Sequence, residues 1–363
     1  MSRGSPFIAG LLLGSLALGA GFLAFRYLPA VSDGPSQNRD RLLAELPEAV
    51  ERLPRALPRQ ARTQPCGFGQ ALVSAQRQSV KPVNPQDTDV GPWDHQTPES
   101  RIDAMLDATA CQRPGVPLGL DEADIGDLLR SGPMLVRRAH ANGERLPARA
   151  WALRIWALGQ DLVANDPEHY AVQGFRLQAV SIDAFVWWWS QPDLTDEERA
   201  EGELLAKALM ERAPAGQRVV QRLATITLRR GLEDPAALAL EPDELSAHVR
   251  DAATWWNTLA EATGTPAAPP PEPLATEGEP ALLATLTDPQ APELVQAHHH
   301  LARARLAAVL LFAGPRPGAE ACPAPWEGAP PVDPVTAKAA EWDANLCRLT
   351  LGDRSFGPGV TGR

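Results

Sequence analysis

The sequence lacks the short motifs by which many enzymes are recognised. It has no phosphate-binding Walker loop, no G-x-S-x-G turn, no dinucleotide-binding fingerprint, no haem-binding C-x-x-C-H and no zinc-binding H-E-x-x-H. We therefore assign no catalytic, cofactor-binding or metal-binding residue, and we predict no cofactor. A site assembled from residues far apart in sequence would escape this search. The absences favour a non-enzymatic protein and leave an enzyme as the alternative.

Positive charge is also scarce. The chain has 34 Lys and Arg residues against 45 Asp and Glu residues, which gives a formal net charge of −11. A surplus of negative charge opposes binding to the phosphate backbone of DNA or RNA. We expect no nucleic-acid partner.

Residues 7–25 form one long apolar run without any charged residue. As a helix this run would be about 28 Å long, close to the ~30 Å hydrocarbon core of a bilayer. A cleaved signal peptide has a shorter apolar core and small residues before the cleavage site. The best candidate cleavage site here is Leu28-Pro29-Ala30, which has Leu where a small residue is needed and Pro beside the bond to be cleaved. We predict a retained signal-anchor with one membrane span. The bulk of the chain would then be extracytoplasmic, and periplasmic if the source is a Gram-negative bacterium.

All four cysteines, Cys66, Cys111, Cys322 and Cys347, follow the apolar run. In an exported domain an even number of cysteines favours disulfides. A zinc site is the alternative, but there is no C-x-x-C and no His at ligand spacing from any Cys. Three pairings are possible, and we favour Cys66 with Cys111 and Cys322 with Cys347.

Apolar residues recur at helical spacing through most of the chain, and alternating strand patterns are almost absent. We predict an all-α fold. It would consist of an N-terminal transmembrane helix, then an irregular helical bundle or helical-hairpin array, then a loop-rich tail pinned by a disulfide. The predicted divisions are a membrane anchor (1–30), a stalk (31–38), a helical extracytoplasmic domain (39–262), a Pro-rich linker (263–280) and a last long helix with a cysteine-bracketed tail (281–363).

Two local patterns predict helix boundaries and packing. Asp166 followed by Pro167 is typical of a helix start, with Asp as the cap and Pro at the first helical position. Within residues 241–262 the apolar residues follow a 4-3-4-3 spacing that is typical of a helix packed against another helix. These residues are Leu245, Val249, Ala252, Trp256 and Leu259.

Trp187, Trp188 and Trp189 are consecutive. On a helix they would span about 200° of the surface, so they cannot all enter one core. They either pack in the core and at the helix end, or at least one is exposed. Exposed aromatic side chains often mark contacts with other proteins. With Trp255, at the margin of the predicted packing face, these residues form our candidate interaction surface for a protein partner.

His298, His299 and His300 form the most visible polar cluster. Neighbouring side chains on a helix point about 100° apart, so three consecutive imidazoles cannot bind one metal ion. A solvent-facing or partly packed run is the better interpretation. The alternative is an envelope hydrolase in which dispersed acids converge with His169, His248 and this run.

Asp183 lies among apolar residues in a predicted helix over residues 168–190. A carboxylate in such surroundings can be an acid with a shifted pKa. An arginine partner such as Arg154 or Arg176 would explain it without catalysis.

The tail contains the pattern P-x-D-P-x-T-x-K from Pro331 to Lys338, followed by Trp342, Cys347 and Gly352. It resembles a carboxy-terminal element of membrane-anchored exported bacterial proteins, P-x-D-P-[aromatic or aliphatic]-T-G-K followed by a short hairpin. Its arrangement is similar to that of the tails of secretion pseudopilins. Here Ala337 stands in place of the Gly, which weakens the turn, and the acid that a pseudopilin has early in its apolar helix is absent. The resemblance implies an exported, anchored protein with a disulfide-pinned tail; the helical body resembles no family.

These observations predict a membrane-anchored helical protein that binds or scaffolds a partner in the bacterial envelope. The alternatives are the envelope hydrolase and an accessory component of a secretion apparatus. The tail alone suggests the last of these.

Overall fold

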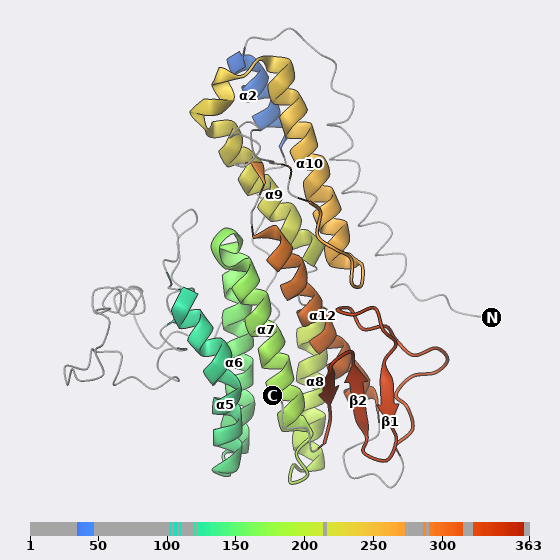
Figure 1. Ribbon diagram of the computed structural model, residues 1–363. Coiled ribbons are helices and arrows are strands. Elements are labelled where there is room, and N and C mark those ends of the chain that lie inside the picture. The colour runs from blue at the N-terminus through green and yellow to red at the C-terminus, as the bar shows by residue number, and fades with distance from the viewer. Residues whose placement is uncertain are drawn as a thin grey trace, which may run out of the picture. The chain divides into compact units, whose positions relative to one another are not determined.

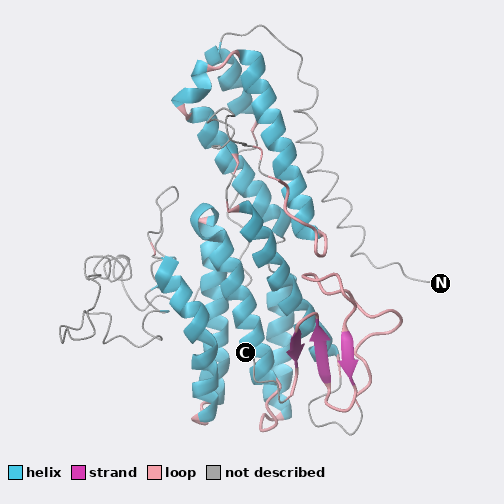
Figure 2. Ribbon diagram, in the orientation of Figure 1, coloured by secondary structure: helices cyan, strands magenta, loops and turns pink. Residues whose placement is uncertain are grey.

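The computed structural model describes residues 35–46, 102, 105–106, 109, 120, 122–212, 216–272, 274, 286–287, 290–314 and 322–358. Helices account for most of them (70%), and three short strands form a sheet near the carboxy terminus (Figures 1 and 2). The prediction of a mainly helical protein is confirmed at this level. The predicted membrane segment, residues 7–25, lies outside the described residues, as do Cys66 and Cys111. No helix among the described residues is long and apolar enough to cross a bilayer.

The chain divides into two compact units whose segments alternate along the sequence. The first comprises Met1–Glu51, Val220–Glu261 and Pro270–Ala291; the second comprises Arg52–Val219, Ala262–Pro269 and Pro292–Arg363. Helices α9 (Gly216–Glu233) and α10 (Pro242–Gly264) each contribute residues to both. Each unit therefore combines segments that are distant in sequence.

In the first unit, helix α2 (Pro35–Glu45) includes residues that the sequence assigned to a stalk. Asn38 is buried, and its side-chain amide donates to the Pro242 carbonyl at 2.8 Å and to Ser246 Oγ at 3.1 Å. These bonds fix α2 against the start of α10. The predicted packing face of α10 is confirmed, since every one of its members is at most 1% exposed: Leu245, Val249, Ala252, Trp256 and Leu259.

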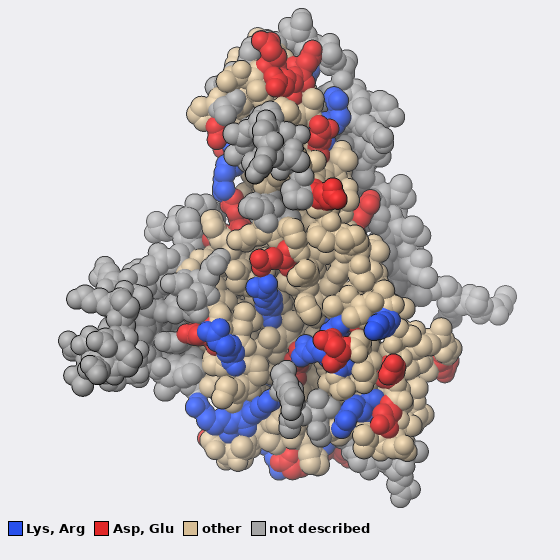
Figure 3. Space-filling view, in the orientation of Figure 1, with Lys and Arg blue, Asp and Glu red and all other residues tan. Residues whose placement is uncertain are grey.

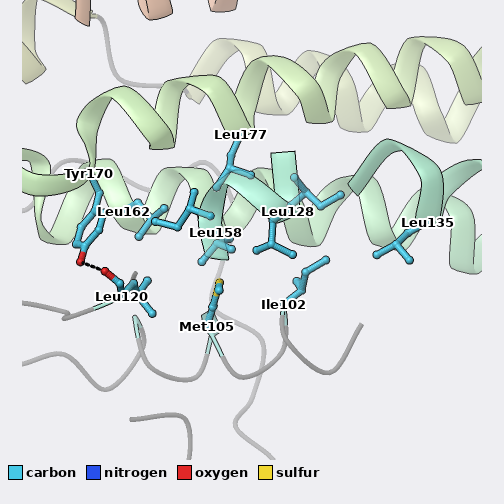
Figure 4. Packing of buried hydrophobic residues seen from close by; sticks show 11 residues of the cluster. Ile102, Met105, Leu120, Leu128, Leu135, Leu158, Leu162, Tyr170 and Leu177 are labelled. Carbon is cyan, nitrogen blue, oxygen red and sulfur yellow. Dashed lines mark hydrogen bonds between the residues drawn. The ribbon is translucent and has the colours of Figure 1, made fainter. Parts of the chain in front are cut away.

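The core of the second unit lies among α5 (Glu122–Ala141), α6 (Arg145–Asn165) and α7 (Pro167–Trp189). Figure 4 shows leucine side chains from these helices in a row with Tyr170 at one end, where its hydroxyl donates to the Leu120 carbonyl at 2.7 Å. This bond satisfies a phenol that is otherwise buried in apolar surroundings. Helix α6 is buried on more than one side, through Ile155, Trp156, Leu158, Leu162 and Val163.

Helix α7 begins at Pro167, as predicted. The Asp166 side chain makes no capping hydrogen bond to the helix backbone. Its Oδ1 instead lies 2.7 Å from Nδ1 of His169. The predicted start is therefore right and the predicted role of the Asp166 carboxylate as a cap is wrong.

Helices α6 and α7 cross closely because two glycines meet at the crossing. A Cβ atom on Gly174 would lie 2.5 Å from Cγ2 of Val163 and 2.7 Å from the carbonyl oxygen of Gly159. No side chain fits at that distance. The pair of glycines therefore sets the separation of the two helices.

The end of α7 and the start of α8 (Asp196–Arg212) are fixed by side chains of the connecting segment. Thr195 and Glu198 form a reciprocal capping box, in which the Thr195 amide donates to Glu198 Oε2 at 2.8 Å and the Glu198 amide donates to Thr195 Oγ1 at 3.2 Å. The buried Arg199 guanidinium donates to the carbonyl of Trp189, the last residue of α7, and to that of Gln191. A cation at this position also complements the negative end of the helix dipole.

The tail contains a three-stranded antiparallel sheet in the order β1 (Glu341–Asp343), β2 (Arg348–Leu351) and β3 (Arg354–Phe356). It lies beside helix α12 (Ala291–Ala313) (Figure 1). The strict all-α prediction is wrong here, because strands of three or four residues give too short an alternation to stand out in the sequence. The predicted disulfide between Cys322 and Cys347 is formed and closes a loop of 25 residues.

Candidate functional site

A group of paired charged side chains lies where the tail meets α12 and α7. We name it the charged clamp: Arg303, Asp333, Asp353, Asp183 and Arg354. Arg303 Nε and Nη2 donate to the two carboxylate oxygens of Asp333 at 2.8 and 2.7 Å. Arg303 Nη1 donates to Asp353 Oδ1 at 2.8 Å. One guanidinium therefore binds two points of the tail at once.

Asp333 is the centre of the turn formed by the tail motif. Its Oδ1 also accepts the Val335 amide at 3.1 Å, and its Oδ2 accepts the hydroxyl of Thr336. Burial alone would raise the pKa of Asp333, but the hydrogen bonds from Arg303, Thr336 and Val335 outweigh it and lower that pKa. The carboxylate is therefore held in its charged form.

The same turn contains a residue with left-handed backbone, Ala337. The Ala337 amide donates to the Asp333 carbonyl at 2.9 Å, and Ala337 has φ of 55°. This left-handed conformation is unfavourable for a residue with a Cβ atom. Ala337 therefore places backbone strain in the turn.

The β2–β3 hairpin reaches the clamp through Gly352, which has φ of 59°. A Cβ atom there would lie 2.6 Å from Asp333 Oδ2 and 2.9 Å from Arg303 Nη2. Glycine is therefore required twice, for its backbone conformation and for the close approach to the buried ion pair.

Asp183, from the middle of α7, binds the tail through Arg354, with 2.7 Å between Oδ2 and Nη2. Its arginine partner is thus neither of the two that the sequence suggested; Arg176 pairs with Glu293 at 3.0 Å. Burial raises the pKa of Asp183, and the charge of Arg354 opposes this shift. The pairing gives the buried acid a structural role in holding the tail against α7.

The side chains of the charged clamp attach the tail to α12 and α7. Both oxygens of Asp333 are occupied by donors, and Arg303 donates from all three of its nitrogens. Asp353, at its outer edge, is 81% exposed and is the part of the clamp in contact with solvent. The arrangement fixes a folded, disulfide-linked tail to two helices.

The three consecutive histidines have three different surroundings. The ring of His298 packs edge-on against Phe175 at 5.3 Å, and burial lowers its pKa to about 3. His299 is buried with Nε2 3.0 Å from the Ala262 carbonyl, while His300 is exposed near Arg303. The three imidazoles do not face one another.

The other two histidines of the hydrolase alternative have local partners. His169 pairs with Asp166, and His248 Nε2 lies 3.7 Å from Glu244 on its own helix. Within the described segments, no three His, Cys, Asp or Glu side chains are placed to hold one metal ion. Among the described residues, His169, His248 and the run at 298–300 thus each have neighbours of their own.

The candidate tryptophan surface is reduced to one ring. Trp188, Trp189 and Trp255 are 0%, 1% and 5% exposed, so these three are core residues and not surface ones. Trp187 remains partly exposed. The guanidinium carbon of Arg137 lies 5.4 Å from the centre of its ring. The imidazole of His140 contacts the ring edge-on at 5.6 Å.

Comparison of the chain with protein-family models, with curated proteins and with solved structures found no match in any of the three. A functional conclusion therefore depends on the residues of the chain itself.

Proposed function

We propose that the protein is a membrane-anchored, extracytoplasmic helical protein that binds or scaffolds a partner protein in the bacterial envelope. The apolar segment at residues 7–25 supports the anchor. The disulfide between Cys322 and Cys347 supports an oxidising compartment, because such bonds are rare in the cytosol.

The observation that carries the binding role is the surface around Trp187. We name it the Trp187 patch: Trp187, Arg137 and Met134. Arg137 stacks over the partly exposed indole, and Met134, one turn earlier on α5, is 67% exposed. Trp, Arg and Met are the residue types most enriched in protein interfaces. Because Arg137 is already stacked on the ring, the two side chains lose less conformational entropy when a partner covers them.

The charge around this patch indicates the chemistry of the partner. Figure 3 shows basic side chains gathered over α5 and α6 at the lower left, although the whole chain is acidic. Attraction between opposite charges speeds association and favours the correct orientation. The partner surface would therefore combine an apolar centre with acidic side chains.

The test is recovery of a partner from solubilised membranes with the full-length chain as bait. We expect a stoichiometric protein partner whose recovery falls at least about tenfold with the double change Met134→Glu and Arg137→Glu. Arg250→Glu, a charge reversal at an exposed position of α10, is the matched control and should recover it fully. Absence of a stoichiometric partner, or equal recovery by both variants, would contradict the proposal.

A second candidate, an accessory component of a secretion apparatus, is favoured by the tail alone. The turn at Asp333 followed by the β2–β3 hairpin is the arrangement that the resembled element implies. Co-purification with such an apparatus would support this role, and a partner from outside it would count against it.

A further inference from the structure

Arg305 lies on α12 two residues after Arg303, but no carboxylate of the described residues contacts it. Its Nε and Nη2 atoms are buried and make no hydrogen bond to any residue that the structure describes. In Arg303 these same two atoms hold both oxygens of Asp333. Arg305 therefore presents an unoccupied copy of the two-donor edge that Arg303 uses to bind a carboxylate.

Two further unpartnered groups come from α6 and α7. The guanidinium carbon of Arg305 lies 5.8 Å from the ring centre of Trp156, which is fully buried and whose Nε1 has no acceptor in the described structure. Gln178 is 1% exposed, and neither atom of its amide has a hydrogen-bond partner there.

The packing of α6 on α7 places Gln178 at the level of Trp156. Ser181 Oγ donates to the Ala152 carbonyl, and a Cβ atom on Gly159 would lie 3.0 Å from Cγ of Gln178. Trp156 falls between Ala152 and Gly159 on the same face of α6, because these residues are four and three positions apart. Gln178 of α7 therefore lies close to the level of the Trp156 indole of α6, over which the Arg305 guanidinium of α12 is placed.

Burial of these groups without partners is costly. Buried polar groups are almost always hydrogen-bonded, and buried charges are almost always paired. Burial lowers the pKa of Arg305 to about 10, which reflects the cost of holding this cation away from water. His298 lies two turns earlier on the same face. Burial and the nearby Arg305 lower its pKa and keep it neutral, so it does not balance the charge of Arg305. The cluster offers several N–H donors and one excess positive charge.

We propose that Arg305, Gln178 and Trp156 form a binding site for a small oxyanion, a carboxylate or phosphate group, within the second unit. The Nε and Nη2 edge of arginine matches two oxygens of either group. The Trp156 indole and the Gln178 amide supply the remaining donors. Water could satisfy individual donors, but only an anion also neutralises the guanidinium. The inference concerns a ligand group and is independent of the proposed partner protein.

The test is calorimetric titration of the purified full-length chain with sodium acetate and with sodium phosphate, against sodium chloride at equal ionic strength. We expect saturable binding of at least one oxyanion, and the tighter of the two identifies the ligand class. Arg305→Lys keeps the charge but loses the two-donor edge, so binding should weaken at least about tenfold. Gln178→Leu should weaken it several-fold. Arg176→Lys, at an exposed arginine paired with Glu293, is the matched control and should bind as the wild type does.

Two results would overturn the proposal: no saturable binding of either oxyanion by the wild type up to about 100 mM, or equal affinity in the wild type and Arg305→Lys. If Arg305→Lys does not fold, the wild-type titration and Gln178→Leu decide. Unchanged affinity in Gln178→Leu would place the anion elsewhere.

Discussion

Asp333 and Arg303 form a two-point ion pair from which water is excluded: their side chains are 0% and 1% exposed, and both carboxylate oxygens lie within 2.8 Å of a guanidinium nitrogen. Thirty residues separate them along the chain, so the pair is a tertiary contact that fixes the tail to α12. Arg303 also binds the exposed Asp353 through Nη1, but Asp333 is the partner of its Nε and Nη2 edge. Loss of Asp333 therefore leaves that buried edge without a carboxylate.

The first prediction concerns this pair. Asp333→Asn should lower the free energy of unfolding by about 3–5 kcal/mol, since the buried Nε and Nη2 edge of Arg303 loses its carboxylate and only the exposed Asp353 stays paired with the guanidinium. Asp353→Asn is the matched control at the exposed end of the same guanidinium and should cost about 1 kcal/mol or less. Urea unfolding followed by circular dichroism measures both. Equal destabilisation by the two variants would show that burial of the pair is unimportant.

Two neighbouring positions with left-handed backbone should respond in opposite directions. Gly352→Ala should destabilise the protein by about 2 kcal/mol or more, through its backbone conformation and the contact of its Cβ atom with the Asp333 carboxylate. Ala337→Gly should stabilise it by roughly 0.5–1 kcal/mol, because glycine removes the strain in the turn at φ of 55°. Thermal unfolding of the two variants checks the signs. A stabilising Gly352→Ala would refute the close approach.

The helix pattern was predictable from sequence because it is local. The Asp166–Pro167 junction and the packing face of α10 depend on spacing within a few turns, and both lie where the sequence puts them. The clamp depends on pairs distant in sequence, such as Asp183 with Arg354. The apolar surroundings of Asp183 in the sequence indicated an arginine partner, but they did not indicate which arginine it is. The Asp-Pro-x-Thr motif was the one local signal that pointed to Asp333.

Burial was harder to infer than helix position. Trp187 is partly exposed, whereas Trp188 and Trp189 are buried. Phe312 and Arg199 cover Trp189, and neither contact has a signature in the sequence. The strands of the tail were missed for a different reason. In β2 only Leu349 and Leu351 alternate inward, and two residues are too few to define a period.

The glycine crossing of α6 and α7 gives a third prediction. Gly174→Ala should destabilise the protein by about 2 kcal/mol or more, because its Cβ atom would overlap Val163 and the Gly159 carbonyl. Gly126→Ala is the control within α5, where the nearest atom to the added Cβ is 4.0 Å away. That change should stabilise the helix by about 0.5–1 kcal/mol. Denaturation midpoints that fall equally for both variants would contradict the close crossing.

The fourth prediction is a pH dependence centred on His298. Burial lowers its pKa from the ordinary 6.5 to about 3 in the folded protein, so the unfolded chain binds the proton more tightly. The stability that neutral His298 contributes is therefore complete above about pH 6.5 and is lost as the pH falls toward 3. His298→Leu should make the decline between pH 6.5 and 4 shallower, by up to about 1.4 kcal/mol per pH unit. Unfolding free energies of the two proteins that run parallel over this range would contradict the prediction.

The proposed location and function depend on an anchored chain with an oxidised tail, and thiol labelling of fractionated cells tests this most directly. We expect the full-length chain to sediment with the membranes, and Cys322 and Cys347 to react with an alkylating reagent only after reduction. Recovery of the chain from the cytosolic fraction with both thiols reactive before reduction would contradict the account.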